Sequence, residues 1–264
     1  MSSESPEFIA TSLKNGVLTI MLNRPDKRNA IHNEMRAEMI AAFENAATDT
    51  TVRAVILTGA GKGFCSGGDI SGMRDRLDSP AGEVAFNGWQ RQLSTHRSIA
   101  AIHQMPKPVI AALNGAAFGL GLDLALACDF IVAAEGAKMS MSFVKRGLVS
   151  DGGGMYFLPR RVGLQRAKEL ILSARVVETD EALAIGMIDR VSSPETLQDD
   201  VQAWAEELSI GSPVSIALTK SILDKTFESS DDQILALGRE AQAICYTTTE
   251  HRNSVEEFLN KSKK

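Results

Sequence analysis

Short apolar runs of strand length recur along the first half of the chain. They cover residues 16–23, 52–59, 107–115 and 127–136, and several are apolar enough for strands that are buried on both faces. Segments with apolar residues at helical spacing lie between them, at residues 33–47 and 86–104. Strands that alternate with helices in this way predict an α/β domain with parallel crossover connections.

The second half of the chain is mostly helical from about Leu158 onward. The spacing predicts a short helix over 180–185, then a break with a small strand at 186–188, and after that only helices, over 195–209, 213–226, 231–248 and 252–261. We therefore predict two regions, a core of residues 1–200 and a helical C-terminal region of residues 201–264.

Two glycine-rich loops each follow a buried strand, at Gly59–Asp69 and Asn114–Asp123. The first does not match a P-loop, because Gly63 stands where the motif has Ser or Thr, and the second lacks the third glycine of a dinucleotide fingerprint. The glycines could simply let helices pack close to strands. A helix that begins at the end of such a loop, however, also presents free N–H groups at its N-terminus.

Two such N–H groups side by side could point at one oxygen and form an oxyanion hole. That site would stabilise the enolate of a thioester, which forms when a proton leaves the carbon next to the carbonyl. The reaction needs a base near the hole, and the candidates are Asp123 and Asp151. Asp151 lies in the segment FVKRGLVSDGGG, where an aspartate before three glycines is also an ordinary turn sequence.

Composition narrows the possible partners. A net charge of −5 over 264 residues gives no bulk attraction to nucleic acid or to an anionic membrane. No apolar run approaches the length of a membrane span, and the acidic N-terminus resembles neither a signal nor a transit peptide. The three cysteines form no CxxC pair, and the four histidines show no metal-binding spacing. We therefore expect a cytoplasmic protein that binds no metal, no nucleic acid and no membrane.

Five segments together resemble the enoyl-CoA hydratase/isomerase (crotonase) superfamily. They are NRPDKRNAI, GKGFCSGGDI, KPVIAALNGAAFGLGLDLALACDFIVAAEGAKM, GLVSDGGGMYFLPRRVGLQRAKELIL and EALAIGMIDRV. The resemblance implies a crotonase-type spiral of ββα units, which places the active site in residues 1–200 and oligomerisation in the helical region 201–264. It also implies acyl-CoA substrates, homotrimers or dimers of trimers, and no cofactor besides the coenzyme A of the substrate. It does not fix the reaction, because one fold serves many reactions.

The resemblance implies roles for individual residues. The two oxyanion donors match the backbone N–H groups of Gly68 and Leu120. The positions that contact coenzyme A match Lys27, Arg28, Ala30, Ser66, Gly68, Asp69 and Ile70, and those that reach it from a neighbouring subunit match Phe258 and Lys261. We expect the wall of the acyl pocket to consist of Met73, Leu77, Phe86, Trp89, His96, Met141 and Phe143.

The chain departs from the typical hydratase at two positions. Asp123 matches the first of two glutamates that share a water, but is one methylene shorter, and Phe143 replaces the second glutamate and cannot transfer a proton. Asp151 instead matches an aspartate found in dienoyl-CoA isomerases, in ring-opened epoxide isomerases of phenylacetate breakdown and in 4-chlorobenzoyl-CoA dehalogenase. In the isomerases this aspartate moves protons, and in the dehalogenase it attacks the aromatic ring.

Four readings of the site remain open. The leading hypothesis is double-bond isomerisation with Asp151 as proton shuttle. Hydration by Asp123 and Asp151 is an alternative, and so is nucleophilic attack by Asp151 with His96 as the base that activates water, although Phe143 stands where that dehalogenase has a tryptophan. The last possibility is an acyl-CoA-binding protein without catalysis.

Overall fold

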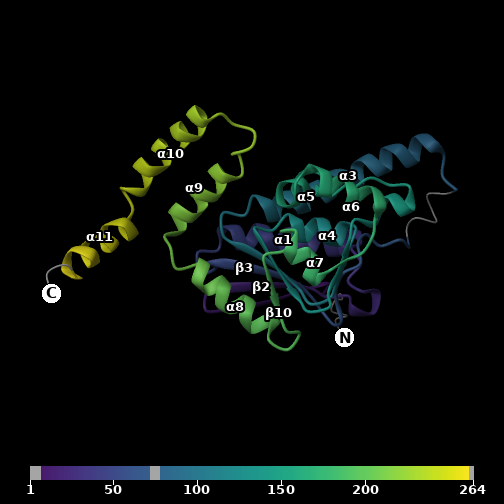
Figure 1. The fold of residues 1–264 in the computed structure, drawn as a ribbon, viewed down its shortest axis with the longest axis horizontal. Coiled ribbons are helices and arrows are strands. Elements are labelled where there is room, and N and C mark those ends of the chain that lie inside the picture. The colour runs from purple at the N-terminus through teal and green to yellow at the C-terminus, as the bar shows by residue number, and fades with distance from the viewer. Residues whose placement is uncertain (1–6, 72–77, 262–264) are drawn as a thin grey trace, which may run out of the picture.

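A six-stranded sheet forms the body of the protein (Figure 1). A computed structural model describes residues 7–71 and 78–261 of the chain. In spatial order the strands are β1 (Ile9–Lys14), β2 (Val17–Leu22), β3 (Ala54–Gly59), β5 (Val109–Leu113), β7 (Phe130–Ala134) and β10 (Arg190–Ser192). β1 is antiparallel to β2 and the other pairs in this sheet are parallel, which confirms the predicted crossovers. The small strand predicted at 186–188 is four residues too early, because those residues form the turn that precedes β10.

A second, four-stranded sheet turns the crossovers into a spiral. Its strands are β4 (Gly63–Cys65), β6 (Ala116–Phe118), β8 (Lys138–Ser140) and β9 (Val177–Glu178). Along the chain, β4 follows β3, β6 follows β5 and β8 follows β7. Each turn of the spiral therefore contributes one strand to the large sheet and one to the small sheet. β4 and β6 lie inside the two glycine-rich loops, and this sheet therefore positions both loops.

Helices lie on both faces of the large sheet and around the second sheet. They are α1 (Asn33–Thr48), α3 (Ala81–His103), α4 (Leu120–Leu126), α5 (Gly154–Val162), α6 (Leu164–Ser173), α7 (Thr179–Ala184) and α8 (Leu197–Leu208), with short 3₁₀ turns η1 (Pro25–Lys27) and η2 (Ser142–Arg146). In β3, Val55 and Leu57 pack in the cluster that contains α1, whereas Ala54 and Ile56 pack in the cluster that contains α8. Successive side chains of a strand point to opposite faces, so a strand that is covered on both sides reads as a continuous apolar run.

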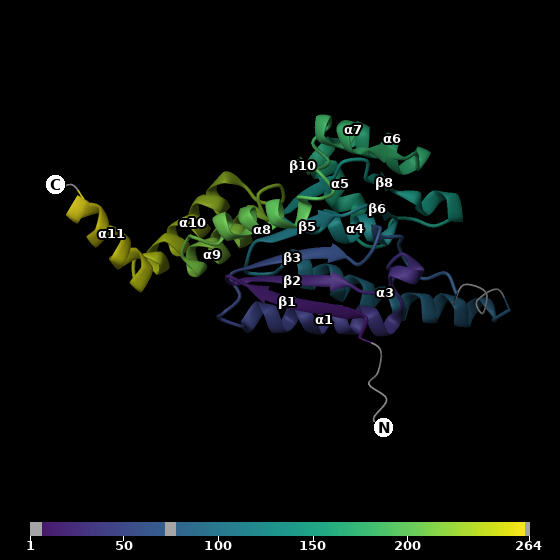
Figure 2. The ribbon, with the colours of Figure 1, turned by 90° about the horizontal axis from the view of Figure 1, so that it is seen from below.

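The last three helices leave the body of the molecule. α9 (Pro213–Leu223), α10 (Asp231–Cys245) and α11 (Thr249–Lys261) extend away from the two sheets (Figures 1 and 2). No residue of these helices is buried in the single chain. The expected division at residue 200 falls within α8, which buries Leu197, Val201 and Trp204 against the sheet, so the projecting part begins after α8. Among the described residues, no helix combines the length and the apolar character that a membrane crossing requires.

Candidate active site

Asp151 lies on the loop between η2 and α5, and its side chain is half-buried. Its Oδ2 accepts a hydrogen bond from Nε2 of Gln92 at 2.6 Å, and α3 supplies this partner from 59 residues earlier in the chain. Sequence reasoning missed Gln92. The available signal was its position on α3, one turn from both Trp89 and His96, which were expected at the acyl pocket. His96 itself is exposed.

Asp123 holds the loop that carries Asp151. The carboxylate of Asp123 is completely buried, and its Oδ2 accepts the backbone N–H of Gly152 at 2.9 Å, while the Ser150 hydroxyl donates to Oδ1 at 3.1 Å. The two donors flank Asp151, so Asp123 fixes the backbone on both sides of it. A Cβ on Gly152 would lie 2.7 Å from Oδ2 of Asp123, and a Cβ on Gly154 would collide with Oδ1. Glycines follow Asp151 because the loop closes directly around this buried carboxylate.

The protonation of Asp123 is unusual for an aspartate. Burial raises its pKa to about 7, and the nearby charge of Asp151 adds to the rise, although the hydrogen bonds from Gly152 and Ser150 favour the anion. A substrate could reach this carboxyl only if the loop moved, because no part of Asp123 is exposed. The structure therefore gives the two candidate bases different environments, one enclosed and one accessible.

The two candidate oxyanion donors belong to neighbouring backbone segments. Gly68 pairs with Ile31 in a parallel bridge, in which Ile31 donates to Gly67 at 2.8 Å and Asp69 donates to Ile31 at 2.9 Å. This pairing uses the groups on either side of Gly68, and within residues 7–71 and 78–261 the N–H of Gly68 has no backbone acceptor. The same is true of the N–H of Leu120, the first residue of α4. A Cβ on Gly67 would lie 3.6 Å from the nitrogen of Leu120, so the two segments are close together.

Phe143 and the Asp151 loop lie next to the second donor. Gly119 has a φ of +53°, and a Cβ there would approach the Phe143 ring to 3.8 Å. The Cδ1 atom of Leu120 would lie 2.7 Å from a Cβ on Gly152, so the side chain of Leu120 packs against the loop of Asp151. One region therefore brings together the N–H of Leu120, which has no backbone acceptor among the described residues, the ring of Phe143 and the loop of the half-buried Asp151.

The described part of the expected acyl-pocket wall is largely open. Phe86 and Trp89 on α3 are 58% and 60% exposed and stack with ring centroids 6.4 Å apart. Met141 is buried in the core. Met73 and Leu77 lie outside the described residues.

Two arginines in this region, Arg36 and Arg91, were not predicted. Arg36 of α1 is buried, its Nη1 donates to Asn33 at 2.9 Å, and its Nε has no hydrogen-bond partner among the described residues. Burial and the nearby Arg91 lower the pKa of Arg36, while the charge of Asp151 raises it. No ion pair within 4.0 Å joins Asp151 to either arginine in the described part of the chain.

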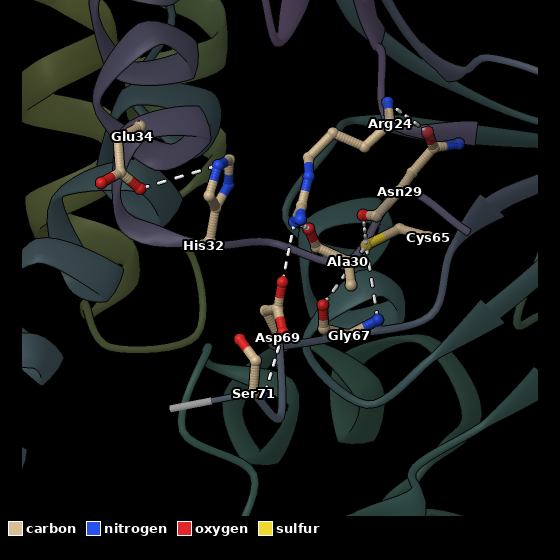
Figure 3. A network of polar contacts seen from close by, with 9 residues as sticks. All are labelled: Arg24, Asn29, Ala30, His32, Glu34, Cys65, Gly67, Asp69 and Ser71. Atoms are coloured by element: carbon tan, nitrogen blue, oxygen red, sulfur yellow. Dashed lines mark hydrogen bonds and ion pairs between the residues drawn. The ribbon is translucent and has the colours of Figure 1, made fainter. Parts of the chain in front are cut away.

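Arg24 ties together the segments that are expected to contact coenzyme A (Figure 3). Its Nη1 donates to the carbonyl of Ala30 at 2.6 Å and to Oδ2 of Asp69 at 2.9 Å. The backbone N–H of Ser71 and the ion pair with Arg24 lower the pKa of Asp69 to about 2, despite partial burial. Asp69 is therefore a negative cross-link at neutral pH, and it holds the loop after Gly68 in place.

The buried side chain of Asn29 links the segment around Arg24 to the first glycine-rich loop by hydrogen bonds. It is completely buried, its side-chain amide donates to the carbonyls of Ala60, Gly63 and Phe64, and its Oδ1 accepts the backbone N–H of Arg24. Sequence reasoning missed both Arg24 and Asn29, although both lie in the segment NRPDKRNAI. The residues above this framework that were expected to contact coenzyme A are exposed, namely Lys27, Arg28, Ser66, Gly68 and Ile70.

Phe258 and Lys261 do not join this site in the single chain. Both are exposed residues of α11. Figures 1 and 2 place α11 at the opposite end of the molecule from α3, which carries Gln92. These two positions can meet a coenzyme A site only if that site belongs to another subunit.

Comparisons with known proteins find relatives over nearly the whole chain. The family model for enoyl-CoA hydratase/isomerase matches residues 12–264. The chain is 36% identical over 255 residues to 1,2-epoxyphenylacetyl-CoA isomerase of Escherichia coli, covering 97% of this chain and 96% of that protein. It is 32% identical over 248 residues to short-chain-enoyl-CoA hydratase of Clostridium acetobutylicum, covering 94% and 92%. The crystal structure of an enoyl-CoA hydratase/isomerase from Cupriavidus metallidurans superposes with a TM-score of 0.89 at 35% identity, covering 98% and 95%.

The spiral of two sheets, the helical C-terminal region and these matches define one class of protein. The chain belongs to the enoyl-CoA hydratase/isomerase family, within the crotonase superfamily, and is an enzyme that acts on acyl-CoA.

Proposed function

We propose that this enzyme shifts a double bond in an unsaturated acyl-CoA, with Asp151 as the group that removes and returns the proton. The observation that supports this most is the different accessibility of the two carboxylates. Asp151 is half-buried beside the start of α4, whereas Asp123 is enclosed by the loop it holds. A relative named for a double-bond isomerisation, the Delta(3,5)-Delta(2,4)-dienoyl-CoA isomerase of Pongo abelii, is 38% identical over 216 residues, covering 80% of this chain and 66% of that protein, and supports this class of reaction.

In the proposed reaction the thioester oxygen accepts hydrogen bonds from the N–H groups of Gly68 and Leu120. These donors stabilise the negative charge that develops on the oxygen as the enolate forms. Asp151 takes a proton from one carbon of the acyl chain and delivers it to another, which moves the double bond. The role that we assign to Asp123 is support of the loop, since its oxygens already accept hydrogen bonds from Ser150 and Gly152.

Hydration is the second candidate function, and the Clostridium relative, which is named a hydratase, supports it. Addition of water needs a group that orients the water as well as one that transfers the proton. Phe143 cannot do either, and Asp123 is enclosed. Nucleophilic attack in the manner of the dehalogenase has less support, because Gln92 rather than His96 contacts Asp151.

An assay with a panel of CoA thioesters tests the proposal. The panel contains 2-enoyl, 3-enoyl, dienoyl and 4-halobenzoyl thioesters, and the mass of each product is recorded. We expect turnover of a 3-enoyl or dienoyl thioester to a product of unchanged mass. A gain of one water would indicate hydration instead, and release of halide would indicate attack by Asp151 on the ring.

We also propose that the enzyme is a homotrimer or a dimer of trimers. Helices α9 to α11 bury no residue in the single chain, and large apolar side chains such as Phe227 and Leu235 are 76% and 67% exposed. Lys220 ties α9 to the body through Asp129 at 2.7 Å, but helices that bury no residue are marginal in water, and an apolar surface of another subunit would stabilise them. In such an assembly Phe258 and Lys261 would reach the coenzyme A site of a neighbour.

Light scattering of the purified protein measures this directly. We expect a mass three or six times that of one chain at micromolar concentration. A monomer under these conditions, with α9 to α11 still helical, would contradict the assembly. A dimer would contradict the trimeric arrangement specifically.

A further inference from the structure

We propose that Gln92 is a positioning residue for Asp151, which keeps this carboxyl in one place in both its charged and its neutral form. The inference rests on the proposed role of Asp151 as a proton shuttle. Its basis is the hydrogen bond of 2.6 Å from Nε2 of Gln92 to Oδ2 of Asp151, which connects α3 to the loop before α5.

The group that contacts Asp151 is the neutral side-chain amide of Gln92, not one of the charged groups in the neighbourhood. Arg36 is near Asp151, and Arg91 is near Arg36, yet the group in contact with the carboxylate is a neutral amide. A guanidinium in contact would favour the anion and oppose protonation, and a second carboxylate would favour the acid and oppose deprotonation. An amide N–H donor suits both states, because Oδ2 accepts a hydrogen bond in the anion and remains the carbonyl oxygen when the proton is on Oδ1.

This property is what a shuttle requires. A group that takes a proton from one carbon and returns it to another must keep its position while its charge changes, because proton transfer depends on short distances and alignment. Asp123 fixes the backbone on both sides of Asp151, through Ser150 and Gly152. Gln92 fixes the side chain, and the bond to Oδ2 leaves Oδ1 as the oxygen that exchanges the proton with the substrate.

The other end of the amide supports a functional role. Oε1 of Gln92 is buried and accepts no hydrogen bond from the described residues. A buried acceptor without a donor is unfavourable, and atoms of this kind are uncommon outside functional regions. Among the described residues the amide therefore has one protein partner, Asp151, and does not join α3 to any further element.

Two substitutions of Gln92 test the proposal, with Gln90→Leu as the matched control on an exposed position of the same helix. Gln92→Leu removes the donor, and we expect kcat to fall about 10- to 100-fold with little change in KM, as for loss of a hydrogen bond to a charged group. Gln92→Glu places a second carboxyl against Asp151, so we expect the acid limb of the pH profile of kcat to move to higher pH. The charges of Arg36 and Asp123, which are near Asp151, and of Arg91, which is near Arg36, are the same in both variants.

The pH profile separates positioning from packing. If both Gln92 variants had the same kcat and the same pH profile as Gln90→Leu, the proposal would be overturned. The proposal would also be overturned if the variants lost activity only in proportion to a fall in melting temperature, and if the acid limb of the pH profile of Gln92→Glu did not shift. The role of Asp151 is tested separately: activity that survives Asp151→Asn removes the proposed function, whereas an inactive Asp151→Asn with normal Gln92 variants removes only this inference.

Discussion

Asp151→Asn is expected to lower turnover of the preferred acyl-CoA by about 10²–10⁴-fold, the usual contribution of a positioned acid–base group. Asparagine keeps the shape of the side chain and still offers an oxygen to Gln92, but it cannot take a proton. The loss should appear in kcat, because the Gly68 and Leu120 donors and the exposed coenzyme A positions are unchanged. Steady-state kinetics of both proteins with the same thioester measure it.

The control for this variant is Asp199→Asn, which removes the same charge from an exposed position on α8. It should leave turnover and melting temperature near those of the wild type. Full activity of Asp151→Asn on every thioester in the panel would show that this aspartate is an ordinary turn residue. Covalent acylation of Asp151 by a 4-halobenzoyl thioester, detected by mass spectrometry, would replace the base with a nucleophile.

Gly67→Ala is expected to lower kcat by about 10²–10³-fold, the range observed when one oxyanion donor is lost. Gly67 has a φ of +104°, and a Cβ there would lie 2.9 Å from the carbonyl oxygen of Phe118. That oxygen belongs to rigid backbone, so the Gly67–Gly68 segment must move away from α4. In the proposed oxyanion hole, the N–H groups of Gly68 and Leu120 would then no longer be able to share one oxygen.

Binding measurements separate this effect from general damage to the fold. Acetoacetyl-CoA carries an enolate-like oxygen, so its affinity should fall strongly in Gly67→Ala, while the affinity for free coenzyme A should fall little. Gly82→Ala is the matched control, because Gly82 lies in the first turn of α3 and nothing approaches within 4 Å of an added Cβ. Equal losses for both ligands would mean that the loop does not act as an oxyanion hole.

Prediction of the fold succeeded where apolar runs were long. The predicted strands at 52–59 and 107–115 contain the observed β3 and β5, and the helix predicted over 33–47 is α1, which ends one residue later. β1 and the short strands β4, β6, β8 and β9 were missed. A strand of two or three residues shows no periodicity, and β1 is exposed along most of its length, so neither gives a hydrophobic signal.

Prediction of the site depended on glycines and carboxylates rather than on hydrophobic pattern. The sequence directed attention to the two loops and to Asp123 and Asp151, because these residue types have local requirements that can be recognised in a single segment. It did not show that Gln92 contacts Asp151, since 59 residues separate them and the position of Gln92 near Trp89 and His96 on one helix does not identify its partner. Nor did it indicate that a buried arginine, Arg36, lies near the same carboxylate.

The sequence by itself determined the α/β class and the family, and it directed attention to the two glycine-rich loops and to the acidic residues Asp123 and Asp151. These features follow from local periodicity and from motifs that each lie within one segment. Only the tertiary structure decided which carboxylate is accessible, because burial depends on what the rest of the chain places around a residue. Asp123 is enclosed because Ser150 and Gly152 fold over it, and Asp151 is left beside Gln92 at the edge of the same loop.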